Sequence, residues 1–410
     1  MTTLWDTTGS DVVKALAAAR RTGGAITSGT ALTLIVVADE RNVPEAETAA
    51  TFAASAHPCR VLLVVRREIS APAPRLDAEV QIGGRLGPGE SVVMRMYGRL
   101  ALHAESVTLP LLAPDVPVVT WWLGNPPDAI SHDPLGVFAD RRITDCGFPK
   151  DQVAALDARA ADFAPGDTDL AWTRTTNWRA QLASAADSAV HRITGATVYG
   201  KETNPTARLL AGWLTSRLGV RVPIERERGP AVSAVTLTGA GEETITLRRS
   251  EDGQALLERD GLATTSVPMQ ARDLGDLLAE ELHRIDADIP YADALGAATG
   301  RRALADRAPI RVHVWHDPAR RRSRTPGAGD AGPARMAATK KTTAPRKSPA
   351  PVTKAAKVKK ASTPAPSKAT AAKAASKKAT GRGGVAKTAD RAHTDKKPLH
   401  GKVRDVGTGS

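Results

Sequence analysis

Residues 32–38 have the sequence Leu32-Thr-Leu-Ile-Val-Val-Ala38, and residues 60–65 have the sequence Arg60-Val-Leu-Leu-Val-Val65. Both stretches are short, β-branched and almost wholly apolar, which is typical of strands covered on both faces. The segment between them suits a helix that begins near Pro44, because proline is favoured in the first turn of a helix. The order strand, helix, strand predicts a sheet with helices packed on it.

The rest of the first 160 residues extends this sheet. Ser10 is a suitable N-cap for a helix that ends at Gly23-Gly24, before the first strand. Further strands are predicted at 78–82, 91–100 and 116–123. The glycine-rich stretch 83–89 precedes a strand, so we interpret it as a hairpin loop and not as a dinucleotide site. Residues 1–160 are therefore expected to form an α/β domain with a mixed sheet.

Residues 161–316 predict a second domain, of the α+β class. A first helix is expected to begin at the N-cap Asn177 and to reach Ile193, and a second is bounded by the N-cap Asn204, by Pro205 and by Gly219. Four short strands at 235–238, 244–248, 255–259 and 263–267 predict an antiparallel meander. A last helix begins after Asp273, and a strand at 310–315 ends the globular body.

The charge of the chain is divided between two regions. Residues 317–410 hold 24 basic and 5 acidic residues, a net charge of +19, whereas residues 1–316 have a net charge of −6. The basic segment is rich in Lys, Ala, Pro, Thr and Ser, and it cannot bury enough apolar surface to fold, so we expect a disordered tail. Such a tail is expected to bind nucleic acid or other polyanions without sequence preference. The alternative that its charges serve only solubility stays open.

Composition also indicates the compartment. Two cysteines, Cys59 and Cys146, are too few for a disulfide scaffold and fit a reducing cytoplasm. The first residues lack the pattern of a signal peptide, and the apolar run Leu34 to Ala38 is far shorter than the ~18 residues of a membrane span. We expect a cytoplasmic protein without a membrane segment.

The search for catalytic motifs predicts no catalytic, cofactor-binding or metal-binding residue. The sequence 195–201 matches a phosphate-binding loop up to Lys201, but Glu202 stands where Ser or Thr would hold magnesium. We therefore interpret it as a loop that leads to the cap of the next helix. The pairs His57/Cys59 and His313/His316 supply too few ligands for a zinc site.

Clusters of tryptophan and arginine are more informative. These residue types are enriched among the anchors of protein interfaces. Trp121 and Trp122 are adjacent at a strand end, so they point to opposite faces of the sheet: one is expected to enter the core, and the other must be covered by the second domain, a partner chain or a loop. The partner-binding candidates are Trp121, Trp122, Trp172, Arg174, Trp178 and Arg179. Packing between the two domains is the alternative interpretation of the same residues.

Four stretches in the same order resemble the OpcA family of glucose-6-phosphate dehydrogenase assembly proteins, of the actinobacterial type. They are Asp115-Val-Pro-Val-Val-Thr-Trp-Trp122, Ala139-Asp-Arg-Arg-Ile-Thr-Asp145, Asp169-Leu-Ala-Trp-Thr-Arg-Thr-Thr-Asn-Trp-Arg179 and Ala207-Arg-Leu-Leu-Ala-Gly-Trp-Leu-Thr-Ser-Arg-Leu-Gly219. Where the family commonly has Leu-Thr-Pro-Trp-Arg, this chain has Thr175-Thr-Asn-Trp-Arg179. The resemblance spans most of residues 1–316 and none of the basic tail.

The resemblance implies a protein that is not an enzyme and that activates glucose-6-phosphate dehydrogenase, in the pentose phosphate pathway, by promoting its active oligomer. NADP would then belong to the partner enzyme, and this chain would need no cofactor. Thioredoxin-dependent control, known in cyanobacterial members, would need matching cysteines, and a redox role of Cys59 and Cys146 stays open. One alternative hypothesis is a nucleic-acid-associated protein that acts through its tail. Another is an enzyme that uses the loop 195–201.

Overall fold

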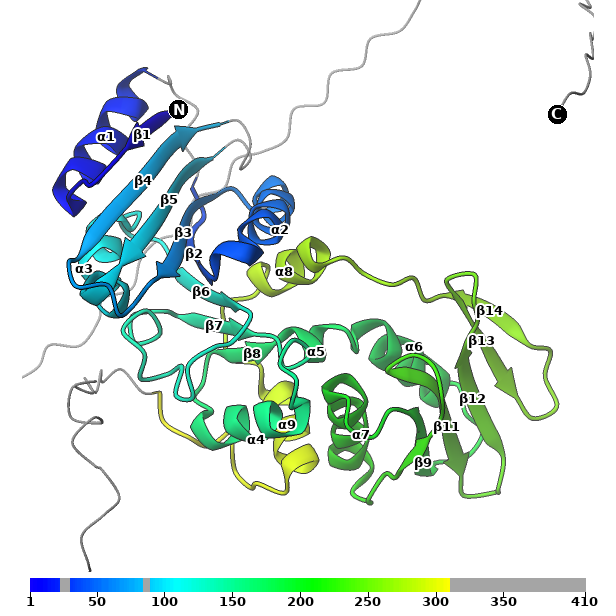
Figure 1. Cartoon of the computed structure of the whole chain (residues 1–410). Coiled ribbons are helices and arrows are strands. Elements are labelled where there is room, and N and C mark those ends of the chain that lie inside the picture. The colour runs from blue at the N-terminus through cyan, green and yellow to red at the C-terminus, as the bar shows by residue number, and fades with distance from the viewer. Residues whose placement is uncertain (23–29, 84–88, 310–410) are drawn as a thin grey trace, which may run out of the picture. The chain divides into compact units, whose positions relative to one another are not determined.

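A computed structural model describes residues 1–22, 30–83 and 89–309 of the chain. It contains one sheet of eight strands and one of six, with helices packed on both (Figure 1). This confirms the predicted combination of a mixed sheet with helices and an antiparallel meander. Every described residue belongs to the compact unit that precedes residue 327. The predicted domain limits 1–160 and 161–316 stay predictions, and the expected strand 310–315 and tail 317–410 lie outside the described residues.

The larger sheet has the strand order β1-β4-β5-β3-β2-β6-β7-β8. The strands from β5 to β8 are parallel, and β4 is antiparallel to both β5 and β1. Their bounds are β1 (Thr2–Leu4), β2 (Leu32–Ala38), β3 (Cys59–Arg67), β4 (Arg75–Ile82), β5 (Glu90–Tyr97), β6 (Val118–Leu123), β7 (Arg141–Thr144) and β8 (Asp167–Asp169). Because β2 has β3 on one side and β6 on the other, the chain reverses its direction of winding at β2. The carboxyl end of β2 is thus the point at which open α/β sheets usually hold ligands.

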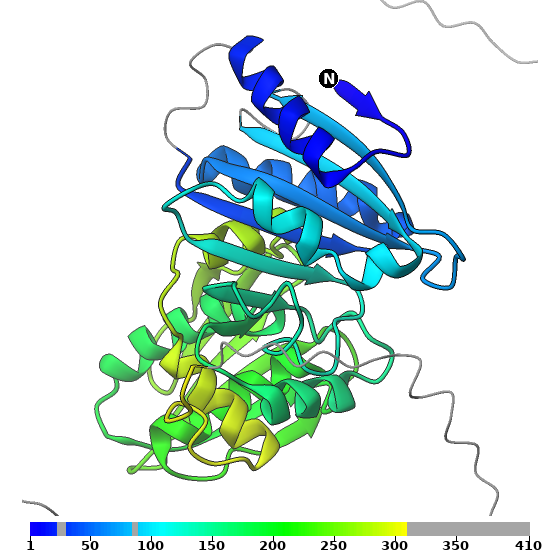
Figure 2. The same ribbon diagram turned by 90° about the vertical axis from the view of Figure 1, so that its left-hand side faces the viewer.

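Helices cover both faces of the larger sheet. Helix α2 (Val43–Ala56) packs on one face and α1 (Gly9–Thr22) on the other (Figures 1 and 2). Neighbouring side chains of a strand point to opposite faces. Accordingly, Trp121 packs in the core on the α2 side and Trp122 in the core on the α1 side. The predicted opposite orientation of the two tryptophans is confirmed.

Helix α8 (Leu274–Leu282) reaches the larger sheet from a distant part of the sequence. Its side chains Leu277, Leu278 and Leu282 join the same hydrophobic core as α2. A Cβ atom at Gly275 would lie 2.7 Å from the Cβ atom of Phe52 in α2, so only glycine permits this close approach. The larger sheet is therefore covered in part by residues that follow the second sheet in the chain.

The smaller sheet has the strand order β10-β9-β11-β12-β13-β14. Its strands are β9 (Ile193–Gly200), β10 (Ile224–Arg226), β11 (Val232–Gly239), β12 (Thr244–Arg249), β13 (Gln254–Arg259) and β14 (Thr265–Pro268). Two helices pack their apolar sides on this sheet, α6 (Thr176–Asp187) and α7 (Pro205–Leu218). Beside them lie α4 (Gln152–Asp162), α5 (Leu170–Thr173) and α9 (Ile289–Thr299).

The sequence signals that bound α7 are confirmed. The Asn204 side chain accepts a hydrogen bond from the backbone N of Thr206 at 2.9 Å, and Pro205 is the first helical residue. Gly219 ends the helix with a φ of 71°, a left-handed conformation that side chains with a Cβ atom disfavour. Cap residues of this kind bound a helix through contacts within a few residues, so they can be recognised from the local sequence alone.

Two predicted caps were wrong. Helix α1 begins before Ser10, and the hydroxyl of Thr8 accepts the hydrogen bond from the backbone N of Asp11 instead. Asn177 lies inside α6, which ends at Asp187 and does not reach Ile193. Ile193 instead begins β9, which lies between β10 and β11 in the smaller sheet. The four-residue spacing of apolar side chains therefore does not mark the end of this helix, because Ile193, which fits the spacing, lies in a strand.

Candidate functional site

A pocket of about 720 Å³ lies where α5 and α6 face the segment 283–290, which joins α8 to α9. Two of its lining residues, Trp172 and Arg179, belong to the predicted partner-binding set. The other walls come from Arg141 in β7, from the end of α8 and from that joining segment. Pockets of this volume commonly hold small organic ligands or the side chains of a partner.

The Arg179 side chain is held in a fixed position within this pocket. Its Cζ atom lies 3.7 Å from the centroid of the Trp172 ring, a cation–π contact. Its Nε donates to Thr175 Oγ1 at 2.8 Å, and its Nη2 donates to Thr176 Oγ1 at 3.0 Å. Trp172 Nε1 donates to Asp288 Oδ2 at 2.8 Å, which fixes the ring. Burial lowers the pKa of Arg179, while the charges of three nearby carboxylates, Asp288, Glu280 and Glu281, act to raise it. None of the described carboxylates forms an ion pair with it.

The glutamates in the pocket, in contrast, already have cationic partners. Glu281 accepts from Arg141 Nε at 3.2 Å and from Arg141 Nη2, and it also accepts from Thr173 Oγ1 at 2.6 Å. Glu280 forms an ion pair with Arg272. Charge-assisted hydrogen bonds of this kind are among the stronger ones in proteins. The pocket therefore combines two paired glutamates with a half-buried arginine, Arg179, that forms no ion pair with a described residue.

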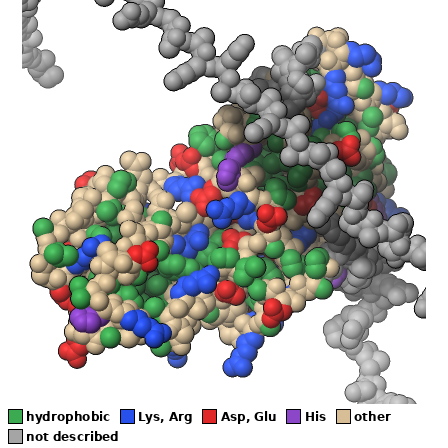
Figure 3. Space-filling view, turned by 180° about the vertical axis from the view of Figure 1, so that it is seen from behind, with side chains coloured by type: hydrophobic (Ala, Val, Ile, Leu, Met, Phe, Trp, Pro, Cys, Tyr) green, Lys and Arg blue, Asp and Glu red, His purple; other side chains and the backbone are tan. Residues whose placement is uncertain are grey.

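Two further basic side chains, His283 and Arg284, lie at the rim of this pocket and are exposed. The His283 ring lies 5.6 Å from the ring of His57, the residue that follows α2. On the face of the molecule seen in Figure 3, acidic, basic and histidine side chains alternate with hydrophobic ones, without a large area of one sign. Recognition at such a surface depends on individual groups rather than on a broad field.

Arg174, another predicted residue, organises the loop after β7. It donates from Nη1 and Nη2 to the two carboxylate oxygens of Asp145, at 2.8 and 2.7 Å. Beside this pair, the fully buried Asp169 accepts from Thr144 Oγ1 at 2.6 Å and from the backbone N of Cys146 at 3.0 Å. Burial, followed by the charge of Asp145, raises the pKa of Asp169. About a third of the Arg174 side chain stays exposed, with a side-chain exposure of 35%.

The four predicted tryptophans lie in the core. Their exposed fractions are 0% for Trp121, 2% for Trp122, 1% for Trp172 and 3% for Trp178. They pack beneath the surface residues and expose almost no area that a partner could contact. Of the six candidates, only Arg174 and Arg179 have side chains that reach the surface. Their role in partner binding stays a prediction.

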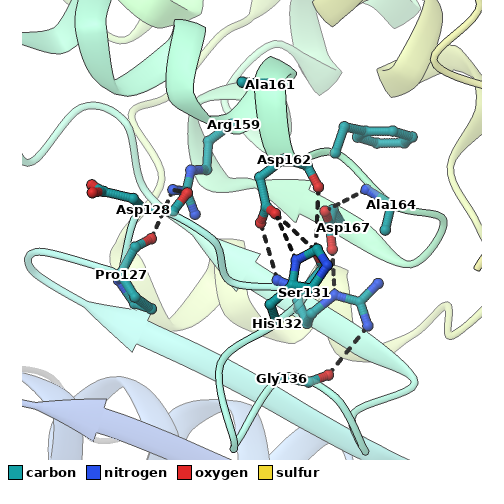
Figure 4. Close-up of polar contacts among 12 residues, drawn as sticks. Pro127, Asp128, Ser131, His132, Gly136, Arg159, Ala161, Asp162, Ala164 and Asp167 are labelled. Carbon is teal, nitrogen blue, oxygen red and sulfur yellow. Dashed lines mark hydrogen bonds and ion pairs between the residues drawn. The ribbon is translucent and has the colours of Figure 1, made fainter. Parts of the chain in front are cut away.

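A cluster of Ser131, His132 and Asp162 was missed by the sequence analysis (Figure 4). Ser131 Oγ donates to Asp162 Oδ1 at 2.9 Å and lies 3.1 Å from His132 Nδ1, which is itself 3.3 Å from Asp162 Oδ1. In a catalytic triad the two ring nitrogens of the histidine contact different partners. Here both contacts use Nδ1, and Ser131 is completely buried. The cluster joins the loop after β6 to the end of α4 and does not have the geometry of a nucleophile with its base.

Arg159 of α4 fastens the same loop (Figure 4). Its Nη2 donates to the backbone oxygens of Pro127 and Asp128 at 2.8 and 2.7 Å. Its Nη1 is buried and has no hydrogen-bond partner. This arginine borders a second pocket, of about 340 Å³, at the carboxyl ends of β6 and β7.

The stretch that resembles a phosphate-binding loop is a strand, so its interpretation as a loop was wrong. Residues 195–200 belong to β9 and pair with β11 and β10. Their backbone groups are therefore used within the sheet. The N–H of Lys201 donates to the backbone oxygen of Ala231 at 3.1 Å. This arrangement does not form the cradle of free N–H groups that a phosphate needs.

The remaining motifs show no converging ligands in the part of the chain that the structure describes. No three His, Cys, Asp or Glu side chains there are placed to hold a metal ion, and His313 and His316 lie outside it. Cys59 and Cys146 are buried free thiols, and burial raises the pKa of Cys59 to about 12. Among the described helices, none is both long and apolar enough to cross a bilayer.

Comparisons with known proteins identify two matching family models, both bearing the name OpcA and both described as domains of a glucose-6-phosphate dehydrogenase subunit. The model of the N-terminal domain matches residues 50–161, and the model of the C-terminal domain matches residues 165–295. A search of curated proteins gave no match.

Solved structures show only a weak similarity. An oxidoreductase from Sinorhizobium meliloti aligns with 12% identity over 68% of this chain and 91% of that chain, at a TM-score of 0.34. An inositol dehydrogenase homologue from Azotobacter vinelandii, complexed with NADH and myo-inositol, aligns with 10% identity over 69% of this chain and 91% of that chain, at a TM-score of 0.31. Likeness at this level carries no argument about function.

Proposed function

Because the chain belongs to the OpcA family of glucose-6-phosphate dehydrogenase assembly proteins, we propose that it binds this enzyme and favours its active oligomer. The observation that carries the proposal is the pair of family matches, which cover parts of both sheets. They support a role in the assembly of glucose-6-phosphate dehydrogenase. In this proposal NADP binds to the enzyme, and the chain itself needs no cofactor. The actinobacterial type and a cytoplasmic location stay predictions.

The carboxyl end of β2 supports a role without catalysis. Asp39 and Glu40 follow this strand, where dinucleotide-binding folds have a glycine-rich turn that admits the pyrophosphate. Glu40 Oε1 lies 3.1 Å from Arg95 Nε, and Glu40 Oε2 lies 3.5 Å from Arg67 Nη1. Two carboxylates and no glycine make this turn unfavourable for a pyrophosphate. The chemistry in our proposal therefore belongs to the partner.

A binding protein can activate an enzyme only if it binds the active state more tightly than the inactive one. A tenfold preference for the active oligomer shifts the equilibrium by about 1.4 kcal/mol. The shift is reciprocal, so conditions that favour the active oligomer must also tighten the binding of this chain. Activation without such a preference would need another mechanism.

A binding assay with immobilised glucose-6-phosphate dehydrogenase of the same organism tests the proposal. The full-length chain should bind saturably, and the same concentration of lysine residues in poly-lysine should not compete. Poly-lysine is the matched control because it reproduces the charge of the tail without the folded body. Binding that poly-lysine abolishes would be attraction to the tail alone, and lack of binding would contradict the proposal.

The charge of residues 317–410 favours a second candidate function, association with nucleic acid. A net charge of +19 predicts that the logarithm of the binding constant falls steeply and linearly with the logarithm of the salt concentration. The measurement is the binding of a random DNA duplex by the full chain between 50 and 200 mM salt. A weak salt dependence would remove this candidate.

A further inference from the structure

We propose that the pocket between α5–α6 and the segment 283–290 binds an oxyanion, either a phosphate or a carboxylate group, through Arg179. The oxyanion can come from a small molecule in solution or from an acidic group of the bound enzyme. Only the second source rests on the proposed function, because it requires that the chain binds glucose-6-phosphate dehydrogenase. A carboxylate is planar and a phosphate is tetrahedral, but each presents two oxygens that can accept hydrogen bonds from a guanidinium.

Arg179 has no direct ion pair with a described carboxylate. Its Nε and Nη2 each donate to a neutral threonine hydroxyl, and Thr176 Oγ1 in turn donates to Glu280 Oε1 at 2.7 Å. Its Nη1 has no acceptor among the described residues and is not buried. A partly buried cation without a direct ion pair has lost hydration that two neutral hydroxyls replace only in part. An external anion that reaches Nη1 would supply the missing partner.

The acids near Arg179 are held by other partners. Glu281 is paired with Arg141, and Glu280 is paired with Arg272. Asp288 accepts from Trp172 Nε1 and, at 2.9 Å, from the backbone N of Tyr291. These carboxylates are held by their own partners and are not free to swing onto Arg179. The exposed Asp286 also lines the pocket, together with the exposed basic residues Arg284 and His283.

The Arg179 side chain is already held in place before an anion binds. Its Cζ atom lies over the Trp172 ring, 3.7 Å from the centroid, and two hydroxyls fix its orientation. Little side-chain entropy is left to lose when an anion binds, and this loss is a main cost of association. A lysine at this position would keep the charge but would lack the planar fork and the stacking surface. The site is therefore specific for arginine rather than for positive charge alone.

The experiment compares full-length variants by calorimetric titration with inorganic phosphate and with succinate. The variants are Arg179→Gln, Arg179→Lys and the rim variant Arg284→Gln. The matched control is Arg217→Gln, which removes an exposed arginine of α7 outside this pocket. Because every variant keeps the basic tail, binding to the tail contributes equally to all. Circular dichroism tests whether each variant is folded. If Arg179→Gln is not folded, Arg284→Gln is used in its place.

A second arm measures the affinity of the same variants for glucose-6-phosphate dehydrogenase. We expect Arg179→Gln and Arg179→Lys to weaken binding of one ligand at least tenfold, with the control within twofold of the wild type. Loss of phosphate or succinate binding identifies a small molecule as the source. Loss of enzyme binding alone identifies an acidic group of the enzyme.

The two proposals fail in different ways. If every variant binds phosphate, succinate and the enzyme as the wild type does, the oxyanion site is overturned and the proposed function stands. If the wild-type chain does not bind the enzyme, the proposed function fails and the titrations with phosphate and succinate alone decide on the site. Equal loss in Arg217→Gln and in the Arg179 variants would also overturn it, because the effect would then be one of net charge.

Discussion

The ion pair between Arg141 in β7 and Glu281 in α8 predicts a large loss of stability when either charge is removed. The two side chains are 3% and 5% exposed, and they join parts of the chain 140 residues apart. Arg141 also donates to the backbone oxygen of Asp286 at 2.9 Å, and Glu281 also accepts from Thr173 at 2.6 Å. Removal of one partner from a buried pair leaves the other charge without compensation, which costs about 3–5 kcal/mol.

The assay is urea unfolding of Arg141→Met, Glu281→Leu and the double variant, followed by circular dichroism. Each single variant should lose about 3–5 kcal/mol, and the double variant should lose less than the sum because no orphaned charge remains. Arg248→Gln breaks the exposed pair with Glu227 and should leave the unfolding midpoint unchanged. Single losses below about 1 kcal/mol, or strict additivity in the double variant, would refute the reasoning.

Three other predictions concern stability and reactivity. Burial acts to raise the pKa of Glu90, but its two arginine partners outweigh this effect and lower that pKa. The stability that Glu90 contributes is therefore fully present above its ordinary pKa of 4.5, and it is lost as the pH falls through the lower pKa of the folded state. Glu90→Gln should therefore flatten the acid limb of stability against pH, and an unchanged limb would contradict this. Burial raises the pKa of both thiols, so Cys59 and Cys146 should resist alkylation by iodoacetamide at pH 8 until the protein is unfolded. Mass spectrometry measures the labelling, and rapid labelling of both thiols in the native protein would contradict this prediction. Gly212→Ala should lower the melting temperature by several degrees because its Cβ atom would lie 2.2 Å from a backbone oxygen of α9, whereas the exposed control Ser216→Ala should not. Equal melting temperatures of the two variants would count against that packing.

The elements that the sequence predicts well are those whose causes are local. The strand at β2 is an apolar run, and α7 is bounded by Asn204, Pro205 and Gly219. The same kind of signal was present but unused at α9, where Asp288 caps the helix and Gly300 ends it with a φ of 73°. Local chemistry alone would have found this helix.

Other elements depend on partners that are far away in the sequence. Strand β7 begins with Arg141 and Arg142, which do not suggest a buried strand. Their burial becomes possible because Glu281 and Asp167 neutralise them. Strand β9 contains glycines that suggest a loop, and it is held by neighbours on both sides. No local pattern contains this information.

The candidate site is predictable only in part for the same reason. Its one wall contains Trp172 and Arg179, which the sequence marks by residue type and by the family motif. Its other wall follows α8, about a hundred residues later, and is brought there by the packing of Leu277 and Leu278 on the larger sheet. That packing, and the pairing of the acids around Arg179, could not be read from spacing.

Whether this chain promotes the assembly of glucose-6-phosphate dehydrogenase can be measured by sedimentation velocity of the enzyme from the same organism, with enzymatic activity assayed on the same samples. The enzyme is measured alone and with the full-length chain, at a salt concentration that suppresses binding to the tail. We expect the chain to co-sediment with a larger form of the enzyme, and we expect specific activity to rise with the fraction of that form. Unchanged sedimentation and unchanged activity at saturating concentrations of the chain would contradict it.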